Sequence, residues 1–200
     1  MESERTFEAI IFDCDGTLAD TMPPHYESWI ATLRRHGLDL SEDRFYALGG
    51  WPTVRILELL AGERGLALDC NSVAAEKETA FEQLLSEVQA IEPVRAVAEK
   101  WRGKVPMAVA TGGVRRIAES ILAHLGILDW FDAVVTAEDV PHHKPAPDIF
   151  LEAARRLGVA PTDCLVYEDS DPGIEAAQRA GMQYADVREF FQPRRVTKSA

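Results

Sequence analysis

Five short strand-like runs alternate with amphipathic helical patterns in this 200-residue chain, and this alternation limits the fold more than any other feature. The first run, residues 9–12, is wholly apolar, as is typical of a strand buried on both faces. The later runs are residues 105–110, 133–136, 164–167 and 183–187. Helical stripes cover residues 94–101, 114–125, 150–157 and 172–180. The pattern predicts an α/β fold with a doubly wound parallel sheet.

The stretch between the first and second runs is far longer than an ordinary crossover connection. It shows helical stripes and no clear strand. Two of these stripes are Tyr26, Trp29, Ile30 and Leu33, and Phe81, Leu84, Leu85 and Val88. We therefore expect two domains: a core formed by residues 1–18 and 90–200, and a small inserted α-helical cap formed by residues 19–89. Ligands of such sheets bind beyond the carboxyl ends of the strands, where the cap would act as a lid.

Composition narrows the class of ligand. The net charge is −12, and hydrophobic residues make up 46% of the chain. A field of this sign repels nucleic acids and anionic membranes, so we expect neither as a partner. It also repels phosphorylated metabolites, so phosphate chemistry would need a local positive group.

The sequence contains few signals for cellular location or oligomeric state. The polar start is unlike a secretory signal, and no apolar run approaches the roughly 20 residues of a membrane span. The three cysteines lack metal-site or redox spacing, which favours reduced thiols. We expect a cytoplasmic monomer.

Acidic residues follow two of the predicted strands. Asp13 and Asp15 come directly after the first, and Glu168 and Asp169 end the fourth. The carboxyl ends of parallel strands meet at one rim, so these carboxylates are expected to converge there. Two acids held together can have their pKa values pushed apart, which suits one as nucleophile and the other as acid and base. Oxygen ligands without His or thiolate support suit Mg²⁺.

Two further loops supply groups that suit an anion. Thr111-Gly112-Gly113 follows the second strand and opens a helix, where backbone N–H groups can approach a phosphate. Lys144 lies in His142-His143-Lys144-Pro145-Ala146-Pro147, before the next helical stripe. Each feature alone is weak, since loops of this kind are common, but the four together are sharper.

Taken together, these residues make the chain similar to the haloacid dehalogenase superfamily of phosphatases. Asp13-x-Asp15-Gly16-Thr17 resembles the family's first motif, Thr111 the second, Lys144 the third and Glu168-Asp169 the fourth, in family order. The resemblance extends from residue 8 to about residue 187. It implies a small phosphorylated metabolite as partner and Mg²⁺ as cofactor.

The resemblance also implies a mechanism. Asp13 would attack phosphorus and form an aspartyl-phosphate, while Asp15 protonates the leaving oxygen and later activates water. Asp13, the Asp15 backbone carbonyl and Asp169 would hold the metal, with Glu168 nearby. Thr111, the Gly112 N–H and Lys144 would hold the remaining phosphate oxygens.

The inserted region resembles the cap of the β-phosphoglucomutase-like subgroup. Thr21, His25 and Trp29 stand at i, i+4 and i+8, where that subgroup has Thr, His and Trp. By resemblance, Thr21 and His25 would touch or orient Asp15, and Lys77 would match a cap lysine. For Trp29 we expect core packing, and an N-cap role stays open for Thr21.

Two alternatives to hydrolysis remain. A β-phosphoglucomutase-type isomerase needs a second phosphate site, but Gly49 and Thr53 replace the Lys and Arg of that pattern, with Arg55 as a possible substitute. A phospho-acceptor (receiver) or sensor domain, the less favoured alternative, would not need the long insertion.

Residues 142–147 and the short cap resemble the small bacterial fructose-1-phosphate phosphatases, so a hexose phosphate is the expected substrate. Cys14 is expected to be a buried residue, with oxidation sensitivity as an open possibility.

Overall fold

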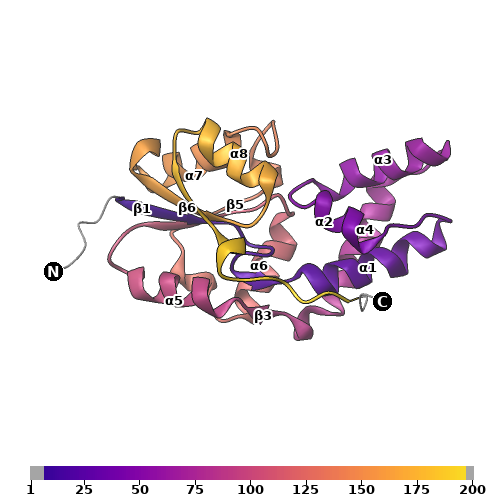
Figure 1. Cartoon of the computed structure of the whole chain (residues 1–200), viewed down its shortest axis with the longest axis horizontal. Helices are drawn as coiled ribbons and strands as arrows, with labels where there is room; N and C mark the ends of the chain where they lie inside the picture. The colour runs from indigo at the N-terminus through magenta and orange to yellow at the C-terminus, as the bar shows by residue number, and fades with distance from the viewer. Residues whose placement is uncertain (1–6, 197–200) are drawn as a thin grey trace.

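A computed structural model describes residues 7–196 of the chain. Figure 1 shows two lobes, a sheet flanked by helices and a separate bundle of helices. The strands are β1 (Ala9–Phe12), β2 (Ala19–Asp20), β3 (Gln89–Ala90), β4 (Met107–Ala110), β5 (Ala133–Val135), β6 (Cys164–Glu168) and β7 (Gln183–Asp186). The α-helices are α1 (Met22–Arg35), α2 (Glu42–Ala47), α3 (Thr53–Arg64), α4 (Cys70–Glu82), α5 (Glu92–Trp101), α6 (Arg115–His124), α7 (Asp148–Leu157) and α8 (Asp171–Arg179). Short 3₁₀ turns lie at Leu85–Glu87, Leu128–Trp130, Ala137–Asp139, Pro161–Asp163 and Val187–Glu189.

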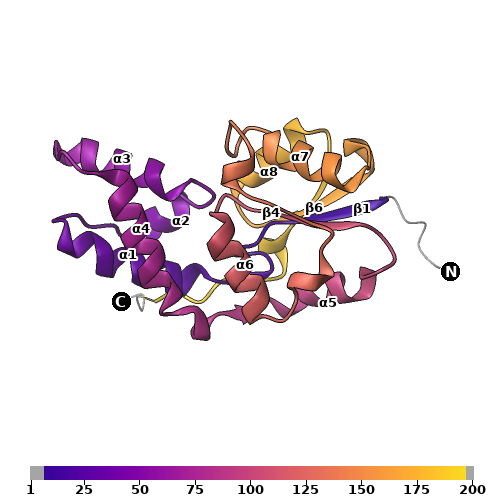
Figure 2. The same cartoon turned by 180° about the vertical axis from the view of Figure 1, so that it is seen from behind.

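The predicted parallel sheet is confirmed. Its five strands lie in the order β5-β4-β1-β6-β7, and every pairing is parallel. The central strand β1 is buried along its whole length because helices cover both faces. Ile10 and Phe12 pack with α5 and α6, whereas Ala9 and Ile11 pack with α7 and α8. Helices on both faces are visible in Figure 2.

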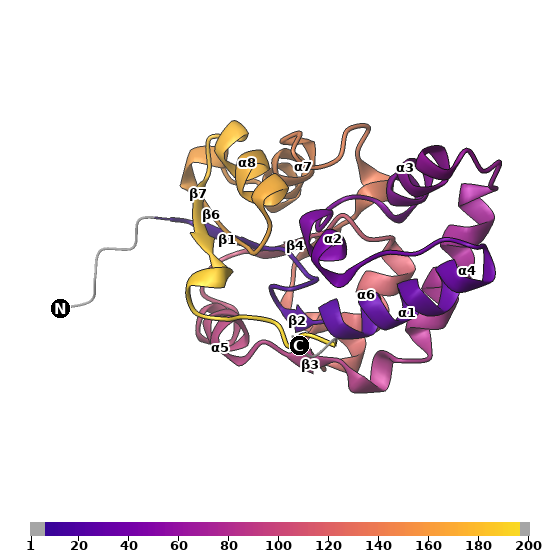
Figure 3. The same ribbon diagram turned by 45° about the vertical axis from the view of Figure 1, so that its right-hand side comes forward.

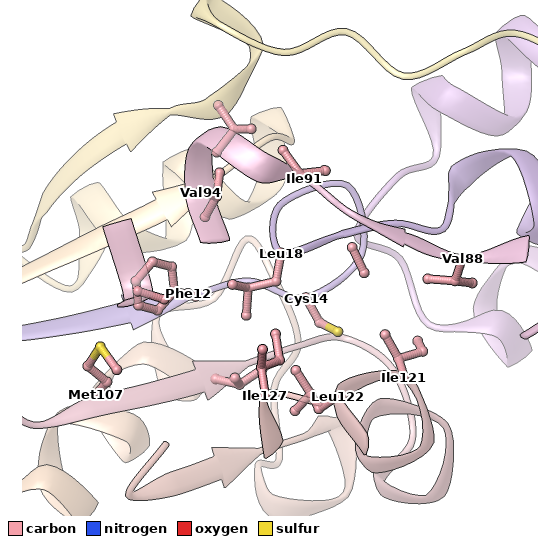
Figure 4. Packing of buried hydrophobic residues seen from close by; sticks show 14 of the residues in the cluster. Phe12, Cys14, Leu18, Val88, Ile91, Val94, Met107, Ile121, Leu122 and Ile127 are labelled. Atoms are coloured by element: carbon pink, nitrogen blue, oxygen red, sulfur yellow. The ribbon is translucent and has the colours of Figure 1, made fainter. Parts of the chain in front are cut away.

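The hydrophobic cluster under the first acidic loop fixes the position of that loop. Figure 4 shows Cys14 and Leu18 pointing into it, next to Ile121 and Leu122 of α6. Cys14 is fully buried, and burial raises the pKa of its thiol well above the ordinary value. The thiol therefore stays protonated and acts as a packing residue, as expected from the sequence.

Helices α1 to α4 form their own hydrophobic cluster, which includes Trp29, Leu33, Phe45 and Leu57. Trp29 is only 2% exposed, which bears out the expectation of a packing role. The stripe expected from Phe81 to Val88 is not one helix. Helix α4 ends at Glu82, and a 3₁₀ turn at Leu85–Glu87 follows.

The connections between the helical bundle and the sheet contain a feature that the sequence did not reveal. Strands β2 and β3 pair antiparallel, with Ala19 opposite Ala90 and Asp20 opposite Gln89. Two residues per strand are too few to show a period of two, so no pattern marked them. Figure 3 shows this small ribbon between the two lobes, where it joins both crossings of the chain.

Candidate active site

The carboxyl ends of β1, β4 and β6 meet at the rim of the sheet that faces the helical bundle. Asp13 follows β1, Thr111 follows β4, and Asp169 follows β6. Asp13 stays within the sheet's hydrogen-bond pattern, because its backbone N–H donates to the Tyr167 carbonyl at 3.0 Å. The parallel topology thus brings together residues that lie more than 150 positions apart.

Lys144 holds the centre of this rim. Its Nζ donates to Asp13 Oδ1 at 2.6 Å, to Glu168 Oε2 at 2.7 Å and to the Ala110 carbonyl at 3.3 Å. An ammonium group has three donors, so all three are used. Lys144 is 5% exposed, and its two carboxylate partners raise its pKa although burial alone would lower it. It therefore remains a fixed positive charge next to Asp13.

Glu168 supports that lysine. Its other oxygen, Oε1, accepts hydrogen bonds from the backbone N–H groups of Asp169 and Ser170 and from Ser170 Oγ. A Cβ atom at Gly173 would lie 2.0 Å from the Glu168 carboxyl carbon, so only glycine leaves room for the side chain. The family resemblance implies that Glu168 lies near the metal, and its hydrogen bonds also tie it to Lys144 and to the start of α8.

Three carboxylates form a cluster whose chemistry fits a divalent cation. Oxygen atoms of Asp13, Glu168 and Asp169 all lie within 4.8 Å of one another. Burial, with added repulsion from Glu168, raises the pKa of Asp169 to about 8, although a hydrogen bond from Thr17 Oγ1 opposes the shift. Burial also raises the pKa of Asp13 well above its usual range, against the effect of Lys144. One ammonium group does not balance this cluster, and hard oxygen donors suit Mg²⁺.

Asp15 lies in a different environment from Asp13. Its Oδ1 accepts from Thr21 Oγ1 at 2.7 Å and lies 3.0 Å from His25 Nε2. Burial favours a raised pKa, but the contact with His25 and the hydrogen bond from Thr21 outweigh it, and the pKa falls to about 2. Asp15 is therefore ionised in this arrangement. Thr21 occupies the N-cap position of α1, but its hydroxyl donates to Asp15 and makes no side-chain cap hydrogen bond to the helix.

Lys77 joins the same network from α4. Its Nζ lies 2.8 Å from His25 Nδ1, and the ring of His25 stacks on Phe81 with centroids 3.9 Å apart. A lysine ammonium group can only donate, so Nδ1 is the acceptor. His25 then carries its proton on Nε2 and donates it to Asp15, which fixes the orientation of both groups.

Thr111 and Gly112 lie at the other side of Asp15. The Thr111 hydroxyl is 3.5 Å from Asp15 Oδ2 and accepts a hydrogen bond from the Gly113 N–H at 3.0 Å. A Cβ at Gly112 would lie 3.0 Å from the Gly50 carbonyl of the loop before α3. The loop before α3 therefore approaches the rim closely at this point.

One cavity connects these residues. It lies between the rim and the helical bundle and is lined by Asp13, Asp15, His25, Thr111 and Asp169. Trp51, Thr53 and Glu78 also line it, and no sequence pattern indicated a site role for Trp51 or Glu78. Arg55, considered as a possible phosphate ligand, does not line it. Its side chain is exposed and pairs with Glu58 on the same helix.

Comparison with known proteins agrees with this geometry. A family model described as haloacid dehalogenase-like hydrolase matches residues 7–181. The fructose-1-phosphate phosphatase YqaB of Escherichia coli is 46% identical over 182 residues, which cover 91% of this chain and 97% of that protein. A phosphorylated carbohydrates phosphatase of Thermotoga maritima is 33% identical, covering 88% of this chain and 82% of that protein.

A solved structure supports the same relationship. The crystal structure of β-phosphoglucomutase from Clostridium difficile superimposes with a TM-score of 0.82 at 26% identity. The match covers 90% of this chain and 84% of that one. Hydrolases and a mutase therefore share the architecture, so fold alone does not separate the two activities.

Proposed function

Because this chain belongs to the haloacid dehalogenase-like hydrolase family, we propose that it is a Mg²⁺-dependent phosphatase of a small sugar phosphate. The observation that carries the proposal is Lys144 Nζ, 2.6 Å from Asp13 Oδ1, beside the carboxylates of Glu168 and Asp169. This arrangement gives an anionic substrate a fixed positive charge and gives phosphorus a positioned nucleophile. It resolves the apparent conflict between a chain of net charge −12 and an anionic ligand.

The first chemical step is assigned to Asp13. A carboxylate oxygen of Asp13 forms a bond to phosphorus while the bond from phosphorus to the sugar oxygen breaks, leaving an aspartyl-phosphate. Asp15 gives a proton to the departing oxygen. In the second step Asp15 takes a proton from water, whose oxygen attacks phosphorus and releases phosphate and free Asp13.

The two roles of Asp15 require its pKa to move during turnover. With Thr21 and His25 as partners its pKa is about 2, so the side chain is ionised and able to accept a proton from water. A bound phosphoryl group brings negative charge next to Asp15, and a nearby like charge raises the pKa of a carboxyl group. The acid form is thereby favoured when substrate is present. Thr21 and His25 keep the side chain in place in both forms.

Asp13, Asp169 and the Asp15 carbonyl are the proposed ligands of Mg²⁺. When bound, the ion would neutralise the carboxylate cluster and stabilise charge on the phosphoryl oxygens. Both oxygens of Glu168 already accept hydrogen bonds, so we assign Glu168 to positioning Lys144. Thr111 and the Gly112 N–H are assigned to hydrogen bonds with the phosphate oxygens, and Lys144, whose three donors are already used, is assigned to attracting these oxygens by its charge.

Residues 19–89 are proposed to act as a cap domain on the core of residues 1–18 and 90–200. Thr21, His25 and Lys77 reach Asp15 from this region, directly or through His25. Cap closure would thus orient the acid and base at the same time as it excludes water.

A hexose phosphate such as fructose 1-phosphate is the proposed substrate, supported by the 46% identity to an enzyme of that name. The mutase alternative is supported by the structural likeness to β-phosphoglucomutase. Against it, Gly49 and Thr53 occupy the loop where a second phosphate would need cations, and Arg55 is paired with Glu58. The long insertion disfavours the receiver alternative.

Other expectations concern partners and location. No helix among residues 7–196 is long and apolar enough to cross a bilayer. We propose a cytoplasmic monomer that binds neither nucleic acid nor membranes. Size-exclusion chromatography with light scattering would test the monomer, and a dimer mass would contradict it.

The decisive experiment is Mg²⁺-dependent phosphate release from a panel of sugar and polyol phosphates. We expect release by the wild type, loss in EDTA, and loss in Asp13→Asn. Asp129→Asn, an exposed carboxylate paired with Arg102, is the matched control and should retain activity. Interconversion of glucose phosphates without net release would favour the mutase. A stable phosphate on Asp13 from a partner kinase, without turnover, would favour the receiver.

A further inference from the structure

Glu78 is a buried carboxylate with no part in the chemistry derived above. It lies on α4, is 9% exposed, and lines the same cavity as Asp13 and Asp15. Burying a charge is costly, so a carboxylate in this position needs partners. Its contacts indicate what it can bind.

Two neighbours hold the carboxylate in place. Thr53 Oγ1 donates to Glu78 Oε1 at 2.8 Å, and Lys77 Nζ lies 3.3 Å from each oxygen. An ionised carboxylate has about four acceptor positions and no donor. Three are used here, so one remains for a donor in the cavity, and a hydroxyl group is a donor of suitable size.

Charge on this side of the cavity excludes a second anion. Of the described residues that line it, His25 and Lys77 are the ones that can carry positive charge. Lys77 directs its three donors to His25 and to both oxygens of Glu78, and His25 bonds Asp15. Neither has a donor left for a second phosphate or carboxylate, which would face Glu78 directly.

The loop before α3 adds an uncharged surface. Trp51 is 39% exposed, one of few large hydrophobic side chains left accessible, and it lines this cavity. The carbonyl of the preceding Gly50 approaches Gly112 closely, so the loop lies next to the proposed phosphate site. An aromatic ring beside a hydroxyl acceptor suits a leaving group that is polar at its edges and uncharged.

We propose that Glu78 binds hydroxyl groups of the leaving group and thereby selects polyhydroxylated monophosphates over substrates that carry a second anion. The inference rests on the proposed phosphatase function and extends it to a specificity-determining residue. Thr53 and Lys77 act on it as positioning residues. A site built around a buried acceptor discriminates strongly against ligands that leave it unpaired.

Three substrates test the proposal: fructose 1-phosphate, fructose 1,6-bisphosphate and p-nitrophenyl phosphate, whose leaving group has no aliphatic hydroxyls. In Glu78→Gln we expect kcat/KM for fructose 1-phosphate to fall by roughly 10- to 100-fold, mostly through KM. The aryl phosphate should change by less than about threefold, because it makes no hydroxyl contact. The ratio of bisphosphate to monophosphate kcat/KM should rise at least about tenfold.

Two further variants make the result interpretable. Glu76→Gln changes a partly exposed carboxylate of the same helix, paired with His36, and should leave all three rates unchanged. Thr53→Val removes the donor to Glu78 and should lower fructose 1-phosphate turnover by roughly 3- to 10-fold with little effect on the aryl phosphate. If Glu78→Gln has a strongly lowered melting temperature, Thr53→Val supplies the test instead.

The outcomes separate two failures. If the wild type hydrolyses these substrates but Glu78→Gln lowers all three equally, or changes none, Glu78 does not bind the leaving group and the inference is wrong while the phosphatase stands. If the wild type releases phosphate neither from these three nor from the panel of sugar and polyol phosphates, the proposed function fails and the inference fails with it.

Discussion

The floor and the roof of the cavity are built in opposite ways. The floor, formed by Asp13, Lys144, Glu168 and Asp169, stands on the ends of parallel strands and on the loop of Lys144. Its ionic contacts join residues 24 and 131 positions apart. The roof is formed by Thr53, Lys77 and Glu78 on helices with a separate hydrophobic cluster, and by Trp51 in the loop before α3. The hydrogen bonds among Thr53, Lys77 and Glu78 span at most 25 positions.

This difference indicates separate roles for the floor and the roof. The floor is locked because the lysine's donors are saturated and the strands beneath it are buried on both faces. The roof connects to the core through two crossings and the short β2–β3 ribbon, so it can change its lining without disturbing the sheet. We therefore expect changes in the floor to abolish chemistry and changes in the roof to alter which substrate is used.

The largest effect is expected from Asp169→Asn in the floor. Loss of a proposed metal ligand should lower kcat by about 10³-fold or more, measured at saturating Mg²⁺. Asp171→Asn, an exposed carboxylate paired with Arg188, should have almost no effect.

For Asp169→Asn we expect stability to rise, although activity falls. In the folded protein the pKa of Asp169 is about 8, above the ordinary value of 3.8, so ionisation between these values costs folded stability as pH rises. In EDTA at neutral pH, Asp169→Asn should therefore melt higher than the wild type, by roughly 2–4 °C for each kcal/mol relieved. A lower melting temperature would contradict the assignment of Asp169 to an unbalanced acidic cluster.

The second largest effect on activity is expected from Glu168→Gln. A glutamine would turn its amide group either towards the Lys144 ammonium or towards the backbone N–H groups, and each choice replaces an attraction with a repulsion. We expect kcat to fall about 10²-fold, and stability to fall by roughly 3–5 kcal/mol because a buried ion pair is broken. Denaturant unfolding measures the second quantity. Equal stability losses in Glu168→Gln and in the roof variant Glu78→Gln would remove the contrast between floor and roof.

His25→Ala tests the boundary between the two regions. Removal of the His25 side chain should lower kcat about tenfold, because Asp15 keeps its hydrogen bond from Thr21 but loses the one from His25. His25 lowers the pKa of Asp15, so its loss should raise that pKa and move the acid limb of the kcat–pH profile upward. His36→Ala, on a histidine paired with Glu76, is the control. An acid limb that stays in place would show that His25 does not act on Asp15.

The smallest effect is expected from Arg55→Ala. Arg55 lies on α3 near the roof but is exposed and paired with Glu58. Activity on mono- and bisphosphates should change by less than about twofold, as for an exposed ion pair. A selective loss of bisphosphate turnover would place Arg55 in the site and strengthen the mutase alternative.

Local patterns in the sequence were sufficient to predict much of the floor. The apolar run of residues 9–12 predicted a doubly buried strand, and strand ends placed Asp13, Asp15 and Asp169 at one rim. The position of its loop indicated Lys144, resemblance to a family added Thr21, His25 and Lys77, and the structure brings all four to the cavity or its network. The Phe81 to Val88 stripe was wrong as a single helix, because spacing alone does not mark where α4 ends.

The sequence by itself determined the α/β alternation, the long insertion and the acidic residues at strand ends, because period and spacing are local properties of a chain. Only the tertiary structure decided that Glu168 belongs to Lys144, that Thr17 bonds Asp169, and that Glu78 enters the cavity beside Thr53. Each of these depends on the direction in which a side chain points after distant segments pack. That direction is set by burial and by competition for hydrogen-bond partners.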